Sequence, residues 1–91
     1  SPVEVESALL GHDAVTECAV IGDLDDRGLI KPKAFVVLAE GHAPDEPTTA
    51  MLVAHCREVI AEYKRPRWIV FVPELPKTAT GKIQRFRLRQ G

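Results

Sequence analysis

Apolar residues recur with helical spacing in two stretches of the chain. In the first stretch, Ser1 and Glu4 occupy the two positions of a capping box, and Pro2 directly follows the cap. A short apolar stripe then runs toward Gly11 through Val5, Ala8 and Leu9. This pattern predicts a short helix at the start of the chain.

The second helical stripe is longer and follows residues 41–47, where glycine and prolines indicate a loop. Thr48 is the expected N-terminal cap, and Pro66 is the expected stop. The apolar positions between them are Leu52, Cys56, Val59, Ile60 and Tyr63. We expect this segment to form the main helix, with one more helical turn over residues 84–89.

Three apolar runs predict β-strands, over residues 15–22, 32–38 and 68–72. The acidic loop 23–28 separates the first two runs, which are therefore expected to pair antiparallel. No repeat or low-complexity segment interrupts this order. The pattern predicts an α+β fold with helices packed on a small, mainly antiparallel sheet, in one domain over residues 1–91.

The composition is that of one small globular domain. The chain has 91 residues, of which 45% are hydrophobic and 27% charged, and no apolar stretch approaches the roughly 20 residues that a membrane helix needs. Cys18 and Cys56 lie far apart among apolar neighbours, which predicts buried, reduced thiols and a cytoplasmic protein. His12, His42 and His55 have no companions at metal-ligand spacing, so no metal site is expected.

Charge is divided unevenly along the chain. Residues 1–56 carry three basic and ten acidic side chains, whereas residues 57–91 carry nine basic and three acidic ones. The basic part also contains Trp68, Phe71 and Phe86, and it suits a polyanion such as nucleic acid or the phosphates of a nucleotide cofactor. The alternative is that these charges only solvate helix and loop faces.

Residues 76–85 form a polar, basic loop with a central Gly-Lys pair. Gly81 lets the backbone approach a ligand closely, Thr80 offers a hydroxyl donor, and Lys82 carries a mobile ammonium with three donors. A P-loop is excluded, because Pro76 stands where its first glycine would be and an isoleucine follows the lysine. The loop suits an anion, although glycine and threonine are also ordinary turn residues.

The longer string around this loop consists of Tyr-Lys-Arg-Pro at 63–66, an apolar run at 69–72 and Leu-Pro-Lys-Thr-Ala-Thr-Gly-Lys-Ile-Gln-Arg at 75–85. This string resembles the C-terminal end of adenylate-forming enzymes, a superfamily of acyl- and aryl-CoA synthetases, peptide-synthetase adenylation domains and luciferases. The resemblance extends upstream through residues 1–6 and 28–38, so it covers nearly the whole chain. Within the superfamily, the chain most resembles benzoate-CoA ligases and their medium-chain acyl-CoA relatives.

The resemblance implies an enzyme that joins a carboxylic acid to ATP, forming an acyl-adenylate, and then transfers the acyl group to CoA. It assigns the adenylation step to Lys82, with Thr80 and Gly81 beside the cofactor. Lys77 is expected to shape the loop. Arg85 is expected either to be structural, since arginine often braces a loop by pairing a carboxylate, or to support the charge of the site. A protein acetyltransferase that acts on Lys82 is a further implied partner.

For the CoA phosphates, the resemblance points to Arg57, Lys64 and Arg65, near the end of the main helix. The alternative is that these cations only complement the helix dipole. ATP, Mg²⁺ and CoA are the implied cofactors of the full enzyme, and its N-terminal domain, expected to be absent from this chain, is the implied partner. No nucleic acid or membrane partner is implied.

Two other interpretations stay open. One is the C-terminal part of a peptide-synthetase adenylation domain, whose acceptor is a carrier protein instead of free CoA. The other is a non-enzymatic basic module that binds nucleic acid or protein, which would show a steep dependence of binding on salt.

Overall fold

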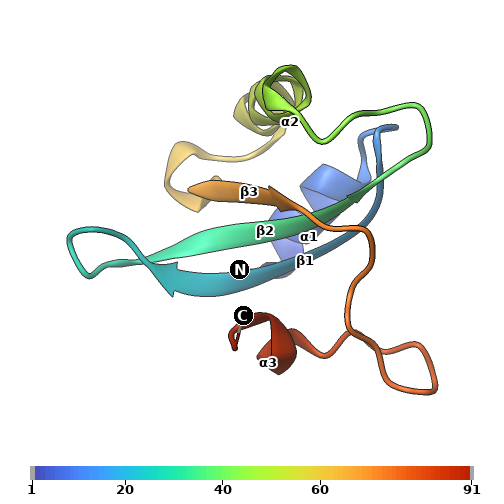
Figure 1. Ribbon diagram of the computed structural model, residues 1–91. Helices are drawn as coiled ribbons and strands as arrows, with labels where there is room; N and C mark the ends of the chain where they lie inside the picture. The colour runs from blue at the N-terminus through green and yellow to red at the C-terminus, as the bar shows by residue number, and fades with distance from the viewer. Residues whose placement is uncertain (1, 91) are drawn as a thin grey trace.

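The computed structural model describes residues 2–90. In chain order its elements are α1 (Pro2–Leu10), β1 (Val15–Leu24), β2 (Ile30–Leu38), α2 (Glu46–Val59), the 3₁₀ turn η1 (Glu62–Lys64), β3 (Trp68–Phe71) and α3 (Arg85–Leu88). Figure 1 shows the strands as a middle layer, with α2 on one side and α3 on the other. The predicted α+β fold is confirmed, while the predicted cap at Ser1 lies outside the described residues.

The sheet has the strand order β1-β2-β3. β1 and β2 form an antiparallel hairpin in which Ala19 lies opposite Phe35. β3 runs parallel to β2, with Val70 opposite Phe35, because α2 carries the chain back to the starting end of β2. Most paired positions are antiparallel, as predicted, and β1 and β3 form the two edges of the sheet.

Side chains of the strands alternate between two apolar cores, one on each face of the sheet. The first core lies beneath α1 and α2 and includes Val5, Leu9, Val20, Val36, Leu52 and Cys56. The second core is covered by the C-terminal segment and includes Ala19, Ile21, Phe35 and Leu75, with Ile83 and Leu88 packed against it. Each face of the sheet is therefore covered by a different part of the chain.

The main helix begins earlier than predicted, because Asp45 caps it in place of Thr48. The Asp45 carboxylate accepts a hydrogen bond from the Thr48 N–H at 3.0 Å, and this bond lowers the pKa of Asp45. Pro47 fits the first turn, where a helix has no partner for an N–H. Thr48 itself is buried inside the first turn.

The same helix ends at Val59, before the predicted apolar position Tyr63, which lies in η1 and is 81% exposed. Ile60 is extended, and the side chain of Arg65 reaches back across the helix end. Its Nε donates to the carbonyl of Ile60 at 2.9 Å, and its Nη2 donates to the carbonyl of Arg57 at 3.0 Å. These bonds satisfy carbonyl groups that the helix end leaves without partners.

The β1–β2 hairpin is longer than predicted, because β1 continues to Leu24 and β2 begins at Ile30. Asp25 closes the short connection between them. One of its side-chain oxygens accepts the N–H groups of Arg27 and Leu29, each at 2.9 Å. The Asp25 side chain therefore supplies hydrogen-bond acceptors for N–H groups of the turn, as the partner strand does for N–H groups of the strands.

Both cysteines lie in the first core as free, buried thiols, as predicted. Burial, with a smaller contribution from the charge of Glu6, raises the pKa of Cys18 to about 12. Burial also raises the pKa of Cys56. At neutral pH both groups are therefore uncharged thiols.

We expect the Cys18 thiol to make the domain less stable as the pH rises from about 9 toward 12. In this range the unfolded chain releases the Cys18 proton while the folded chain keeps it, so rising pH favours unfolding. The measurement is chemical denaturation of the parent and of Cys18→Ala at several pH values. The free-energy difference between the two proteins should shrink as the pH rises, and a constant difference would contradict the assignment.

Candidate functional site

Residues 76–84 form a small β-hairpin. Its two arms are joined by an isolated antiparallel bridge between Lys77 and Ile83. Near its base, the N–H of Gln84 donates to the carbonyl of Pro76 at 2.8 Å. The sequence predicted a loop here, and the structure shows that this loop has a hydrogen-bonded stem.

The tip of the hairpin depends on Gly81. The N–H of Thr78 donates to the carbonyl of Lys82 at 2.8 Å, and the carbonyl of Thr78 accepts the N–H of Gly81 at 3.0 Å. Gly81 has a φ of 89°, which this tight loop requires. Residues with a Cβ rarely adopt such an angle. The Thr78 hydroxyl also accepts the N–H of Lys82 at 3.0 Å and lies 3.1 Å from the Thr80 hydroxyl.

The two lysines of the hairpin and Arg85, which directly follows it, differ in their surroundings. Lys77 forms an ion pair with Glu17 on β1. Arg85 forms an ion pair with Glu6 on α1 at 2.7 Å. Lys82 is exposed at the tip, and within residues 2–90 no hydrogen bond or ion pair engages its ammonium. The segment therefore keeps one cation available and holds two in place.

Glu6 links the base of the hairpin to the sheet. Its carboxylate accepts a hydrogen bond from the N–H of Val20 on β1 at 2.7 Å. Nη2 of Arg85 lies 2.7 Å from both oxygens of the same carboxylate, and Nε of Arg85 lies 3.1 Å from one of them. The structure confirms the expected pairing of Arg85 with a carboxylate.

The other predicted site residues, Arg57, Lys64 and Arg65, lie at the end of α2 and just after it. The guanidinium of Arg65 caps the helix, and Arg57 is exposed on the last turn. The ammonium of Lys64 pairs with Glu4 at 2.8 Å, and their hydrogen bond raises the pKa of Lys64 and lowers that of Glu4.

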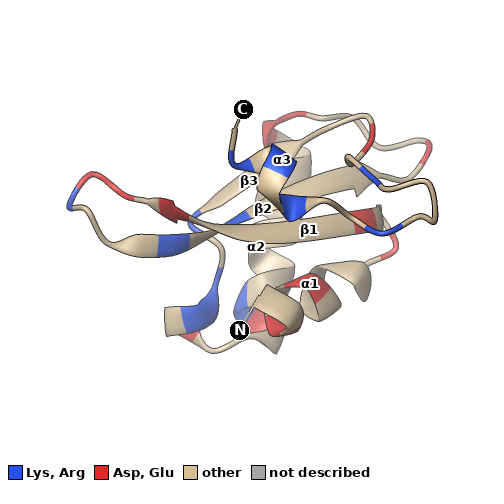
Figure 2. Cartoon of the chain, turned by 90° about the horizontal axis from the view of Figure 1, so that it is seen from below, with Lys and Arg blue, Asp and Glu red and all other residues tan. Residues whose placement is uncertain are grey.

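The structure does not bring these three residues together with Lys82. In Figure 1, α2 and the hairpin before α3 lie on opposite sides of the sheet. Figure 2, seen from below, places α3 with its basic residues in front of the strands. The domain therefore presents separate cationic groups on two faces.

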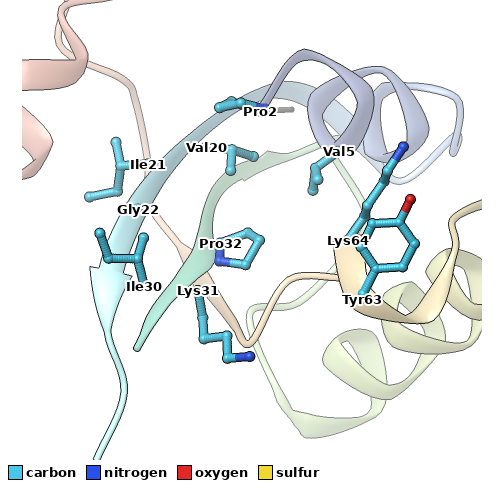
Figure 3. A pocket seen from close by; sticks show the side chains of 10 residues that line it. All are labelled: Pro2, Val5, Val20, Ile21, Gly22, Ile30, Lys31, Pro32, Tyr63 and Lys64. Atoms are coloured by element: carbon cyan, nitrogen blue, oxygen red, sulfur yellow. The ribbon is translucent and has the colours of Figure 1, made fainter. Parts of the chain in front are cut away.

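A groove of about 330 Å³ opens between the start of α1, the strands and η1, beside Lys64. Figure 3 shows its lining, which is mostly apolar and includes Val5, Val20, Ile30, Pro32 and Tyr63. No residue of the 76–84 hairpin lines it. The groove is therefore separate from the Lys82 site.

The aromatic side chains of the basic part do not form one stacking surface. Trp68 and Phe71 point to opposite faces of β3, since three positions separate them along a strand. Phe71 packs against the first core, and the guanidinium of Arg67 lies 5.6 Å from the centre of the Trp68 ring. Phe86 stands apart on α3, 56% exposed.

The family model of the AMP-binding enzyme C-terminal domain matches residues 4–82, most of the chain. The chain belongs to this family. Its matched region ends on Lys82, the exposed lysine of the hairpin. The resemblance inferred from the motif is confirmed.

Among curated relatives, the benzoate–CoA ligase of Thauera aromatica is 60% identical over 89 residues, which cover 98% of this chain and 17% of that protein. A 4-hydroxybenzoate–CoA/benzoate–CoA ligase of Rhodopseudomonas palustris is 47% identical over 99% of this chain and 17% of its own length. A solved anthranilate CoA ligase, in complex with anthranoyl-AMP, is 62% identical with a TM-score of 0.93, over 99% of this chain and 17% of that one.

The AMP-binding C-terminal domain thus spans about one sixth of the length of these relatives. Its similarity to solved CoA ligases confirms the predicted fold of adenylate-forming enzymes. In the part of the chain that the structure describes, no helix is both long and apolar enough to cross a bilayer.

Sequence reasoning missed the two carboxylates that hold the hairpin, Glu6 and Glu17. A signal for Glu6 was present, because it directly follows Val5 on the buried side of a short amphipathic helix. A carboxylate at such a position needs a partner, and Arg85 is the partner. Glu17 carries no comparable signal, because it lies beside the polar Thr16 near the start of β1 and is only partly buried.

We expect Gly81→Val to loosen the tip of the hairpin at a cost of about 1–2 kcal/mol, because the side chain disfavours a positive φ. Amide hydrogen exchange should quicken at Thr78 and Gln84, whose N–H groups cross the hairpin. The matched control is Gly28→Val, since Gly28 has a φ of 78° in the β1–β2 connection. Exchange at Thr78 that is equal in the two variants would show that Gly81 does not set this turn.

Proposed function

We propose that this chain, residues 1–91, is the C-terminal catalytic domain of an ATP-dependent, AMP-forming carboxylate-CoA ligase, and that Lys82 serves its adenylation step. The observation that supports this assignment is the placement of Lys82. Its ammonium has no partner within residues 2–90, although the neighbouring cations on both sides are paired. The 60% identity to a benzoate–CoA ligase supports the enzyme class.

In the adenylation step, a carboxylate oxygen attacks the α-phosphorus of ATP, and the bond to pyrophosphate breaks. Two anions must approach each other, and charge is redistributed over the phosphoryl oxygens. An ammonium with three donors can hydrogen bond to a carboxylate oxygen and a phosphoryl oxygen together. Lys82 supplies this group. Thr80 and Gly81, which shape the tip, are proposed to contact the nucleotide beside Lys82.

In the second step, the CoA thiol attacks the acyl carbonyl and AMP leaves. We assign the CoA phosphates to Arg57 and Arg65, with Lys64 beside them. Arg57 lies on α2, and Arg65 is bonded to its end. Because α2 and the hairpin lie on opposite sides of the sheet, the two steps would use different faces of the domain. This separation supports a mechanism in which the domain turns between the half-reactions.

The remaining parts of the site are assigned to the larger domain that the relatives contain. It would supply the acid pocket, the ATP phosphate site and the Mg²⁺ ligands. Within residues 2–90, no group of three or more His, Cys, Asp and Glu side chains could hold a metal ion. Mg²⁺ would therefore be bound with ATP outside this domain, and the isolated domain should be inactive.

The acid is proposed to be benzoate or a related aryl or medium-chain acid, in a cytoplasmic enzyme. The relatives named for benzoate and 4-hydroxybenzoate support an aryl acid. They also support CoA over a peptide-synthetase carrier protein as acceptor, since both are CoA ligases. No observation favours the nucleic-acid-binding alternative.

An exposed lysine that acts through its charge can be inactivated by acetylation. We propose that a protein acetyltransferase modifies Lys82. Acetylation of the full-length enzyme, mapped by mass spectrometry, should place the mark on Lys82 in parallel with loss of adenylation. Loss of adenylation with the mark on Lys77 or Lys64 alone would reject this proposal.

We expect Lys82→Ala in the full-length enzyme to lower the rate of acyl-adenylate formation by about 10²–10³-fold, comparable to losing one preorganised donor in other enzymes. Thioester formation from supplied acyl-adenylate should remain within a few-fold of the parent. The two rates are measured separately, with Lys33→Ala as a matched lysine control on β2. Equal loss in both steps, or loss in neither, would contradict the assigned role.

A further inference from the structure

We propose that Glu6 and Arg85 are positioning residues of the adenylation step, which set the hairpin in the orientation from which Lys82 acts. This inference rests on the function proposed for Lys82. It concerns two side chains that lie 79 positions apart in the sequence and meet at the open edge of β1.

The first support is the burial of the Glu6 carboxylate. Its side chain is only 11% exposed, and a carboxylate at such a site needs charged or hydrogen-bonding partners. One partner is the backbone of β1. In the part of the chain that the structure describes, β1 pairs only with β2, so alternate N–H groups of β1 face an open edge. The N–H of Val20 is one of these, and Glu6 accepts it at 2.7 Å.

The second support is the geometry of Arg85. A guanidinium that contacts both oxygens of a carboxylate is fixed in its orientation relative to that carboxylate as well as in its distance from it. A lysine ammonium fixes only the distance. Nη2 of Arg85 reaches both oxygens of Glu6, and Nε reaches one of them as well. Since the N–H of Val20 on β1 binds the same carboxylate, through an oxygen that Arg85 also contacts, Arg85 is held relative to the sheet and not merely to α1.

The third support is the position of Arg85 in the chain. It follows the second arm of the hairpin directly, and Ile83 and Gln84 connect it to Lys82. The first arm is tied to β1 by Lys77 and Glu17, a pair that is more exposed than Arg85 and Glu6. Losing the Arg85 contact would leave the second arm held by its hydrogen bonds to the first arm and by half-buried apolar side chains, without a direct polar contact to the rest of residues 2–90.

A shift of the second arm would move the lysine that the tip carries. The Lys82 ammonium has no partner among residues 2–90, so the hairpin, to which its backbone is hydrogen-bonded, determines where this residue lies. Misplacement of a reacting group by about 1 Å can cost roughly 10²-fold in rate. The end of α2, with Arg57 and Arg65, lies on the opposite side of the sheet from the hairpin, so the same shift should not change the rate of the thioester step.

The test uses the full-length enzyme and the ratio of two rates, acyl-adenylate formation and thioester formation from supplied acyl-adenylate. A variant that is partly unfolded loses both rates equally, so the ratio reports positioning and not the folded fraction. We expect Arg85→Ala to lower the ratio by roughly 10–100-fold. Arg85→Lys should recover part of it, because a lysine restores the charge but not the paired contacts.

Glu6→Gln provides the second variant, since the amide oxygen can still accept the N–H of Val20 while the charge for Arg85 is lost. It should also lower the ratio, and Glu6→Gln combined with Arg85→Ala should be no worse than Arg85→Ala alone, because the two act through one contact. Asp23→Asn, which removes the carboxylate paired with Lys33, is the control and should leave the ratio unchanged.

An unchanged ratio in Arg85→Ala and Glu6→Gln would overturn the proposal, as would additive losses in the double variant. These outcomes differ from failure of the proposed function. If Lys82→Ala leaves the ratio unchanged, Lys82 itself is not the adenylation lysine. If Lys82→Ala collapses the ratio while the Arg85 and Glu6 variants do not, only the positioning role is wrong.

Discussion

The ion pair between Glu6 and Arg85 is the contact on which the arrangement of this domain depends. The three-stranded sheet separates two apolar cores, one on each of its faces. Glu6 comes from the helix layer of one face, and Arg85 comes from the C-terminal layer of the other. Because the same carboxylate also binds the N–H of Val20, helix, sheet and hairpin base share one polar junction.

This junction explains how so small a domain can present a lysine in a defined position. The C-terminal segment has little core to hold it, since α3 is one short turn and the 76–84 hairpin has a single bridge. Apolar contacts from Leu75, Ile83 and Leu88 fix its depth on the sheet. The directional contacts of Arg85 fix its rotation, which apolar packing leaves free.

Much of the fold could be predicted from the sequence, because hydrophobic periodicity reports which face of an element is buried. The position of α1 and the three strands followed from such patterns, and Lys82 followed from the extended motif. The end of α2 could not be predicted, because the Arg65 side chain caps it from outside the helix. Glu6 and Arg85 are likewise distant in sequence, and no local pattern could pair them.

The most direct measurement is a crystal structure of the full-length enzyme with a stable acyl-adenylate analogue bound in the adenylation state. We predict that the Lys82 ammonium lies within about 3 Å of an acyl or phosphoryl oxygen of the analogue. The Arg85 guanidinium should remain paired with Glu6 in the same structure. A structure in which another cation contacts those oxygens, with Lys82 left in solvent, would contradict the account.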